Sequence, residues 1–111
     1  MMPADRLVFI VDDDEAVRDS LQLLLESAGH VVHAFEAARD ALESCRGRLP
    51  ACIVTDVRMP EMDALELQEK LAAGSIQVPV IVMTGHADVP LAVRAMKAGA
   101  VDFIEKPFGD D

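Results

Sequence analysis

Several charged side chains and one hydroxyl stand at positions where, if the fold brings them together, they could handle a phosphoryl group. The candidates are a run of four acids, a later aspartate, a threonine and a lysine: Asp12, Asp13, Asp14, Glu15, Asp56, Thr84 and Lys106. Carboxylates at close range raise one another's pKa unless a cation balances them. Hard oxygen ligands favour Mg²⁺, with Mn²⁺ as a second possibility, and Mg²⁺ also prefers phosphate oxygens. The residue types therefore predict phosphoryl transfer to a carboxylate.

Each residue type has a distinct task in that chemistry. Asp56 would be the nucleophile, Lys106 would bind a phosphoryl oxygen as a point charge, and Thr84 would donate a hydrogen bond to another oxygen. Simpler explanations also exist: Asp13 or Asp14 could cap a helix, and Asp56 could be a turn acid. Thr84 could be an ordinary strand residue and Lys106 a solvated edge charge. Taken one residue at a time, these explanations do not account for the occurrence of all these residue types together at one edge of a sheet.

Five short apolar runs, rich in β-branched residues, predict the strands of such a sheet. Because the runs are apolar on both faces, they are typical of buried strands in a parallel sheet. Turn residues or charges bound each of them. The runs are Leu7–Val11, Val31–Phe35, Cys52–Val57, Val78–Thr84 and Val101–Glu105.

The segments between these runs carry apolar residues at helical spacing. Gly29 is expected to end the first helix and Gly99 the fourth, while Asp63 and Asp88 are expected to cap the third and fourth. Pro90 suits the first turn of the fourth helix. The apolar stripes are Val17, Leu21, Leu24, Leu25 and Ala28, then Ala38, Ala41, Leu42 and Cys45, and then Leu67 and Leu71.

Strict alternation of strands and helices predicts one α/β domain over residues 1–111, with a doubly wound five-stranded parallel sheet. In such sheets, ligands bind at the carboxyl ends of the strands, where the strand order changes direction. Asp12 and Asp13 follow the first predicted strand, and Asp56 lies at the end of the third. Thr84 ends the fourth strand and Lys106 follows the fifth. We therefore expect all of them to meet at one edge.

Composition excludes several other classes of protein. The 111 residues carry a formal net charge of −10, which argues against direct nucleic-acid binding, because that requires clustered Lys and Arg. Cys45 and Cys52 have no CxxC spacing, so a zinc site is not expected. The apolar runs are far shorter than the roughly 20 residues of a membrane helix, and no signal-peptide pattern is present. We expect a cytoplasmic protein.

Four segments of the sequence resemble the receiver domain of bacterial two-component response regulators, and within that family its FixJ type, which controls nitrogen-fixation genes. They resemble the acidic pocket, the phosphoacceptor segment, the switch region and the Lys-Pro ending of these domains. In order, the segments are Val8–Asp14 (VFIVDDD), Thr55–Asp63 (TDVRMPEMD), Val80–Val89 (VIVMTGHADV) and Ala92–Phe108 (AVRAMKAGAVDFIEKPF). The resemblance implies a flavodoxin-like strand order of 2-1-3-4-5.

The resemblance also implies a role for each site residue. Asp56 would form a phosphoaspartate with a group from a sensor histidine kinase, and Lys106 and Thr84 would hold phosphoryl oxygens. Thr84 would move toward the phosphate while Phe103 turns inward behind it, although ordinary core packing would also explain Phe103. The implied metal ligands are Asp12 (mainly through water), Asp13, Asp56 and the backbone carbonyl of Arg58.

The resemblance further implies that Arg58 and His86 flank the pocket and tune phosphate hydrolysis, although a plain surface position would also explain either residue. It also implies that the Lys106–Pro107 bond is cis. Such a domain would catalyse only its own phosphorylation and dephosphorylation. It would control an output domain, expected to activate transcription, and could form a phosphorylation-dependent homodimer through the fourth helix and fifth strand.

Two departures from the family pattern stand out. Ala64 occupies a position where the family commonly has glycine, which costs stability only if the backbone there needs a positive φ. The chain also stops at Asp111 without a fifth helix, so we expect a domain cut short after the fifth strand, with an apolar face left exposed.

Three alternatives differ in function. A stand-alone or inhibitory receiver acting through protein contacts would have the same sequence features. A phosphatase of the haloacid-dehalogenase type usually requires a second acid two residues after its nucleophile, and this chain has Arg58 at that position. A flavodoxin-like electron carrier would need a phosphate loop rich in Ser, Thr and Gly after the first strand, where the acids Asp12–Glu15 would repel the phosphate.

Overall fold

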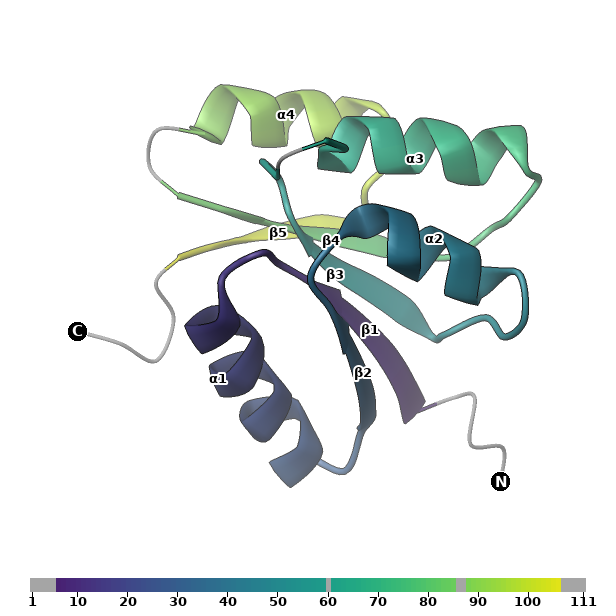
Figure 1. The fold of residues 1–111 in the computed structure, drawn as a ribbon. Coiled ribbons are helices and arrows are strands. Elements are labelled where there is room, and N and C mark those ends of the chain that lie inside the picture. Colours follow the sequence, from purple (N-terminus) through teal and green to yellow (C-terminus); the bar gives the residue numbers. More distant parts are fainter. Residues whose placement is uncertain (1–5, 60, 86–87, 107–111) are drawn as a thin grey trace.

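Five parallel strands and four helices alternate along the chain in a computed structural model that describes residues 6–59, 61–85 and 88–106 (Figure 1). The strands lie in the order β2-β1-β3-β4-β5. This arrangement confirms the predicted doubly wound sheet. The elements are β1 (Leu7–Val11), α1 (Glu15–Ser27), β2 (Val31–Phe35), α2 (Ala38–Cys45), β3 (Cys52–Asp56), α3 (Ala64–Ala73), β4 (Val80–Thr84), α4 (Val89–Lys97) and β5 (Asp102–Glu105).

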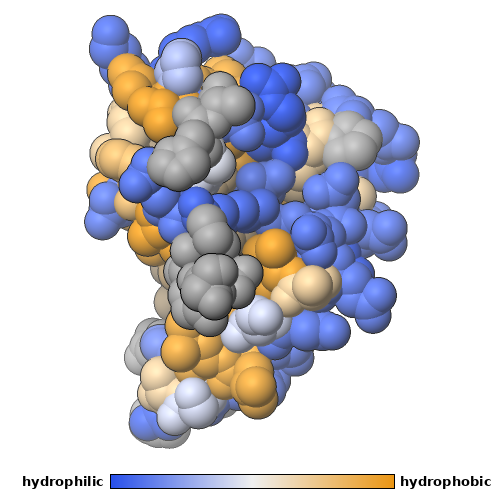
Figure 2. All heavy atoms as spheres, turned by 90° about the vertical axis from the view of Figure 1, so that its left-hand side faces the viewer, coloured by the Kyte–Doolittle hydropathy of each residue, from blue (hydrophilic) through white to orange (hydrophobic). Residues whose placement is uncertain are grey.

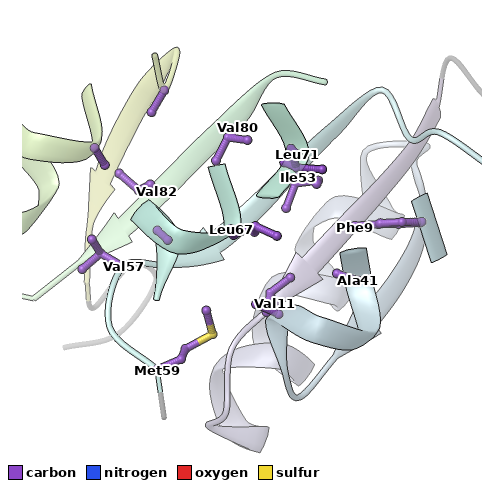
Figure 3. Close-up of a cluster of buried hydrophobic side chains, with 14 of the residues drawn as sticks. Phe9, Val11, Ala41, Ile53, Val57, Met59, Leu67, Leu71, Val80 and Val82 are labelled. Carbon is purple, nitrogen blue, oxygen red and sulfur yellow. The ribbon is translucent and has the colours of Figure 1, made fainter. Parts of the chain in front are cut away.

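Helices cover both faces of the sheet. Figure 1 shows α2, α3 and α4 on one face and α1 on the other, beside β1 and β2. The larger core lies under α2, α3 and α4, and its members include Phe9 and Ile53 from the strands and Leu67 and Leu71 from α3 (Figure 3). A smaller core under α1 includes Ile10, Val32 and Met83 among others, with Leu21 from the helix. Each helix therefore holds its strands through an apolar stripe.

The prediction of strands buried on both faces is right for the centre of the sheet and wrong for its edges. All five residues of β1 are buried, and so is most of β3 and β4. In β2 only Val32 is buried, and β5 is exposed along its whole length. Apolar content alone did not distinguish edge strands from central ones, because Val31, Phe103 and Ile104 are as apolar as their buried counterparts.

Helix ends follow the predicted signals at most positions. Of the two candidate caps of α1, Asp14 is the one that caps, since its carboxylate accepts hydrogen bonds from the N–H groups of Ala16 and Val17. Asp63 caps α3 by accepting from the N–H of Glu66. Gly29 and Gly99 follow α1 and α4 with φ of 99° and 119°, which only glycine adopts without strain.

The stripe predicted for α1 is only partly correct. Leu21 is buried, and Val17 and Leu25 pack against the smaller core. Leu24 is 59% exposed and Ala28 is exposed. The helix therefore buries a narrower face than its leucine content suggested.

Among the described residues, no helix is both long and apolar enough to cross a membrane.

The left-handed position in the β3–α3 connection is Glu61, with φ of 69°, and not Ala64. Ala64 is the first residue of α3 and is fully buried. We therefore predict that Ala64→Gly lowers the free energy of unfolding by about 1–2 kcal/mol, through lost methyl burial and greater chain entropy.

The matched variant Glu61→Gly should have the opposite sign and raise the free energy of unfolding by about 0.5 kcal/mol, because the strained φ is relieved. Urea unfolding of both variants measures the difference. A stabilised Ala64→Gly protein would mean that the connection needs glycine at that position after all.

Candidate functional site

The carboxyl ends of the strands bring the predicted site residues to one edge of the sheet. Asp12 directly follows β1, Asp56 ends β3, Thr84 ends β4 and Lys106 follows β5. Asp12 and Thr84 are fully buried and Asp56 is 8% exposed. Figure 2 looks from the side on which these strands end and shows hydrophilic residues next to separate hydrophobic patches. The edge thus holds buried polar groups within a mixed surface.

Three carboxylates meet at this edge. One oxygen from each of Asp12, Asp13 and Asp56 lies within 4.8 Å of the other two. Asp14 caps α1, whereas its neighbour Asp13 is exposed and contributes an oxygen to the cluster. The N–H of Asp14 donates a hydrogen bond of 2.9 Å to Asp12 Oδ1, which fixes the buried carboxylate. The expected clustering of these acids is therefore present.

The ammonium of Lys106 lies between two of the acids. Its Nζ is 2.7 Å from Asp12 Oδ2 and 3.2 Å from Asp56 Oδ1. The sheet register places it there, because the backbone N–H of Lys106 donates to the carbonyl of Thr84 at 2.8 Å, continuing the ladder of β4 and β5. Lys106 is thus a structural cation of the cluster as well as a candidate phosphoryl ligand.

The electrostatics of the cluster are unbalanced without a further cation. Burial raises the pKa of Asp56 to about 6; Lys106 lowers it in part, while Asp12 raises it further. Burial disfavours the charged form of Lys106, but the Asp12 and Asp56 carboxylates outweigh burial and raise the pKa of Lys106. One ammonium is therefore shared by two buried carboxylates, and Asp56 holds its proton more tightly than an ordinary aspartate.

The donor set fits a hard divalent metal ion. All three candidate ligands are carboxylate oxygens, the class that Mg²⁺ and Mn²⁺ prefer. The buried Asp12 Oδ2 has the Lys106 ammonium as its partner, 2.7 Å away, and the same ammonium also lies 3.2 Å from Asp56 Oδ1. An added cation would balance the charge that one ammonium leaves on three carboxylates, and so lower the cost of holding them together. The role of the Arg58 carbonyl stays a prediction.

Of the two expected switch residues, Thr84 has its hydroxyl bonded to the backbone, and Phe103 is exposed. The Thr84 hydroxyl donates to the carbonyl of Gly85 at 3.0 Å, so the side chain would have to turn before it could bind a phosphoryl oxygen. Phe103 is 42% exposed, which makes the core-packing explanation for it wrong. His86 and Pro107 lie outside the described residues, so the predictions about them stay untested.

Asp88 corrects one prediction and adds a contact that the sequence did not indicate. It occupies the N-cap position of α4, but its side chain makes no capping hydrogen bond. Its Oδ1 instead accepts a hydrogen bond of 2.8 Å from Arg58 Nε, across 30 residues of sequence. The pair joins the connection after β3 to the start of α4. No local pattern signals such a long-range ion pair.

Comparisons with known proteins agree with this geometry. A family model described as the response regulator receiver domain matches residues 8–111. The transcriptional regulatory protein FixJ of Bradyrhizobium diazoefficiens is 52% identical over 104 residues, which are 94% of this chain and 51% of that protein. The chain thus spans about half the length of this curated relative.

Solved structures give the same result. The crystal structure of FixJ-N is similar with a TM-score of 0.88 at 49% identity, covering 99% of this chain and 86% of that one. The solution structure of the beryllofluoride-activated NtrC4 receiver domain dimer has a TM-score of 0.84 at 36% identity, covering 94% and 86%. The matched family model, the FixJ relatives and the shared fold together establish that this chain belongs to the family of response regulator receiver domains.

Proposed function

We propose that the chain is the phosphoacceptor of a FixJ-like response regulator and takes a phosphoryl group on Asp56. One observation carries the proposal: Asp12, Asp13 and Asp56 converge with Lys106 at the carboxyl edge of the sheet. A purely structural role would not require so many like charges at close range, because their repulsion costs stability.

The residues divide the chemistry among themselves. An oxygen of the Asp56 carboxylate attacks phosphorus, an O–P bond forms, and the bond from phosphorus to the donor's nitrogen breaks, leaving its electron pair on the donor histidine. Lys106 already lies 3.2 Å from Asp56 Oδ1, so it is placed to bind an oxygen of the arriving group. Thr84 binds a second oxygen once its hydroxyl leaves the Gly85 carbonyl.

A divalent ion, Mg²⁺ or Mn²⁺, would be held by Asp13 and Asp56 and the Arg58 carbonyl, with Asp12 acting mainly through water. When bound, the ion neutralises charge on the phosphoryl oxygens and orients the group for in-line transfer. Ion pairs and backbone hydrogen bonds hold the side chains of the site in position, namely those of Asp12, Asp56 and Lys106.

The partners we propose follow from the family. The donor is a sensor histidine kinase, and the receiver controls a transcription-activating output domain in the parent protein, with nitrogen-fixation genes as the targets that the FixJ relatives suggest. A phosphorylation-dependent homodimer would use α4 and β5, where Val93, Phe103 and Ile104 are exposed. The domain itself is neither an enzyme acting on other molecules nor a nucleic-acid binder.

A stand-alone receiver acting through protein contacts is the second candidate, because its phosphoacceptor chemistry would be identical. The phosphatase alternative is less favourable, since the residue two positions after Asp56 is Arg58, whose side chain pairs with Asp88. Arg58 therefore does not supply the second acid that phosphatase chemistry would place at this position.

The test is phosphorylation by a small acyl-phosphate donor, followed by intact-mass analysis. With Mg²⁺ the protein should gain one phosphoryl group, and with a chelator it should gain none. Asp56→Asn should remain unlabelled, while Asp63→Asn, which keeps a capping oxygen on α3 outside the cluster, should label normally. Equal labelling of the Asp56→Asn protein would refute the assignment.

A further inference from the structure

The ion pair between Arg58 and Asp88 links the segments that follow two neighbouring strands, β3 and β4, at the edge of the sheet that holds the site. Arg58 Nε lies 2.8 Å from Asp88 Oδ1, joining the connection after β3 to the start of α4. Val57 and Met59, on either side of Arg58, are buried, whereas the Arg58 side chain is 66% exposed. The arginine therefore lies over the surface, next to the phosphoacceptor, and is not anchored in the core.

Arg58 is two residues from the phosphoacceptor in the chain, and nearby carboxylates favour its charged form. Its hydrogen bond to Asp88 is the main reason why the pKa of the guanidinium is raised, and the carboxylates of Asp63 and Asp56 raise it further. A phosphoryl group on Asp56 would add negative charge and several strong acceptor oxygens on that side. The planar donors of a guanidinium match carboxylate and phosphoryl oxygens alike. The phosphoryl group carries more negative charge and more acceptor oxygens than the single Asp88 carboxylate, so it is the stronger partner for Arg58.

Asp88 has an alternative partner of its own. It occupies the N-cap position of α4, where an aspartate carboxylate ordinarily accepts from the N–H of the second or third helical residue. The second residue here is Pro90, which has no N–H, so Leu91 is the donor that remains. While Asp88 holds Arg58, its side chain makes no such bond.

Resting on the function proposed above, we propose that Arg58 and Asp88 form an exchangeable latch. Phosphorylation of Asp56 draws the Arg58 guanidinium from Asp88 onto the phosphoryl oxygens, and the freed Asp88 carboxylate then caps α4 at Leu91. Arg58 becomes a ligand of the phosphoryl group, and Asp88 is a positioning residue that holds it away beforehand. The exchange couples the chemistry on β3 to the first turn of α4.

The first test measures the affinity for beryllofluoride, a phosphoryl mimic, in the presence of Mg²⁺. Asp88→Asn breaks the ion pair but keeps a side chain that can cap, so it should bind about 3-fold more tightly, the amount expected for removing an exposed ion pair. Arg58→Met should bind roughly 10-fold more weakly, because a charge-assisted phosphoryl contact is lost. The double variant decides the mechanism.

If the two partners exchange, Asp88→Asn improves beryllofluoride binding only when Arg58 is present. The double variant should therefore bind beryllofluoride with the same affinity as Arg58→Met. A gain of the same size in both backgrounds would overturn the proposal, since it would mean simple charge repulsion by Asp88. Glu61→Gln is the matched charge control. It removes a negative charge from the β3–α3 connection, but Glu61 pairs with Arg39 instead. A 3-fold gain in this control would equally overturn the proposal.

The second test measures hydrogen exchange at the Leu91 amide. Without beryllofluoride, the wild type and Asp88→Ala should exchange alike, because Asp88 is not capping. With beryllofluoride, Asp88→Ala should exchange faster than both the wild type and Asp88→Asn, since alanine cannot cap. Identical exchange in all three beryllofluoride-bound proteins would overturn the capping step.

Different results would refute the phosphoacceptor role of Asp56 and the latch. A wild-type protein that binds no beryllofluoride, or an Asp56→Asn protein that still binds it, would refute Asp56 as the acceptor. Binding that depends on Asp56 but is unaffected by Asp88→Asn would refute the latch alone.

Discussion

Replacing Lys106 with methionine is expected to lower the free energy of unfolding of the metal-free protein by about 3 kcal/mol at neutral pH. The ammonium is the cation that contacts both Asp12 and Asp56. Methionine keeps the apolar stem but leaves the two carboxylates facing each other without compensation. Removing one partner of a buried ion pair costs roughly 3–5 kcal/mol, and we take the lower end because the Lys106 side chain is 22% exposed.

Chemical unfolding with and without Mg²⁺ measures this effect. Lys97→Met is the matched control, because Lys97 is an exposed lysine in the last turn of α4, and its replacement should change stability by no more than about 0.5 kcal/mol. Added Mg²⁺ should stabilise the Lys106→Met protein more than the wild type, because the ion replaces the missing charge. Equal losses in the two lysine variants would contradict the role given to Lys106.

The opposite change, Asp56→Asn, is expected to stabilise the metal-free protein by about 1–3 kcal/mol above pH 7. The pKa of Asp56 is raised from its ordinary 3.8 to about 6, chiefly by burial. A difference of that size corresponds to about 3 kcal/mol at 1.36 kcal/mol per pKa unit, which we treat as an upper limit. Asparagine has nearly the same shape and carries no charge.

The sign of the pH dependence follows from proton binding. Between about pH 4 and pH 6 the folded protein holds a proton on Asp56 more tightly than the unfolded chain does, so this residue makes stability fall as pH rises. Above about pH 7 the carboxyl is ionised in both the folded and the unfolded protein, so the penalty is complete and constant. The gain in the free energy of unfolding that Asp56→Asn gives over the wild type should therefore be largest above pH 7 and should vanish toward pH 4.

Asp19→Asn provides the control for this experiment, since Asp19 is an exposed acid on α1 away from the cluster. Its stability difference should stay within about 0.5 kcal/mol at every pH. Saturating Mg²⁺ should narrow the advantage of Asp56→Asn, because the ion stabilises only the protein that retains the carboxylate. An Asp56→Asn protein that is less stable than the wild type at pH 8 would contradict the electrostatic account.

The parts of the fold that local patterns specify could be predicted from the sequence. β1 and β2 have the predicted bounds, and Gly29, Asp63 and Gly99 act at helix ends as expected, because turn and cap chemistry depends on a few neighbouring residues. The exposure of β2 and β5 could not be predicted in this way. Whether a strand lies at the centre or the edge of a sheet depends on the pairing of distant segments, which apolar content does not reveal.

The same distinction holds at the site. Alternating strands and helices necessarily bring strand ends together, so the meeting of Asp12, Asp56 and Lys106 was predictable without coordinates. The pairing of Arg58 with Asp88 was not, because 30 residues separate the two and the local signal at Asp88 favoured a helix cap. A residue with two possible partners can be assigned only when the competing partner's position is known.

Localising the phosphoryl group within the chain tests the central claim most directly. After incubation with Mg²⁺ and a small acyl-phosphate donor, borohydride reduction converts a phosphorylated aspartate to homoserine, which peptide mass spectrometry identifies. We predict homoserine at Asp56 and at no other acid, with none formed when a chelator replaces Mg²⁺. Homoserine at Asp12 or Asp13, or label on Asp56 that is independent of a divalent ion, would contradict the account.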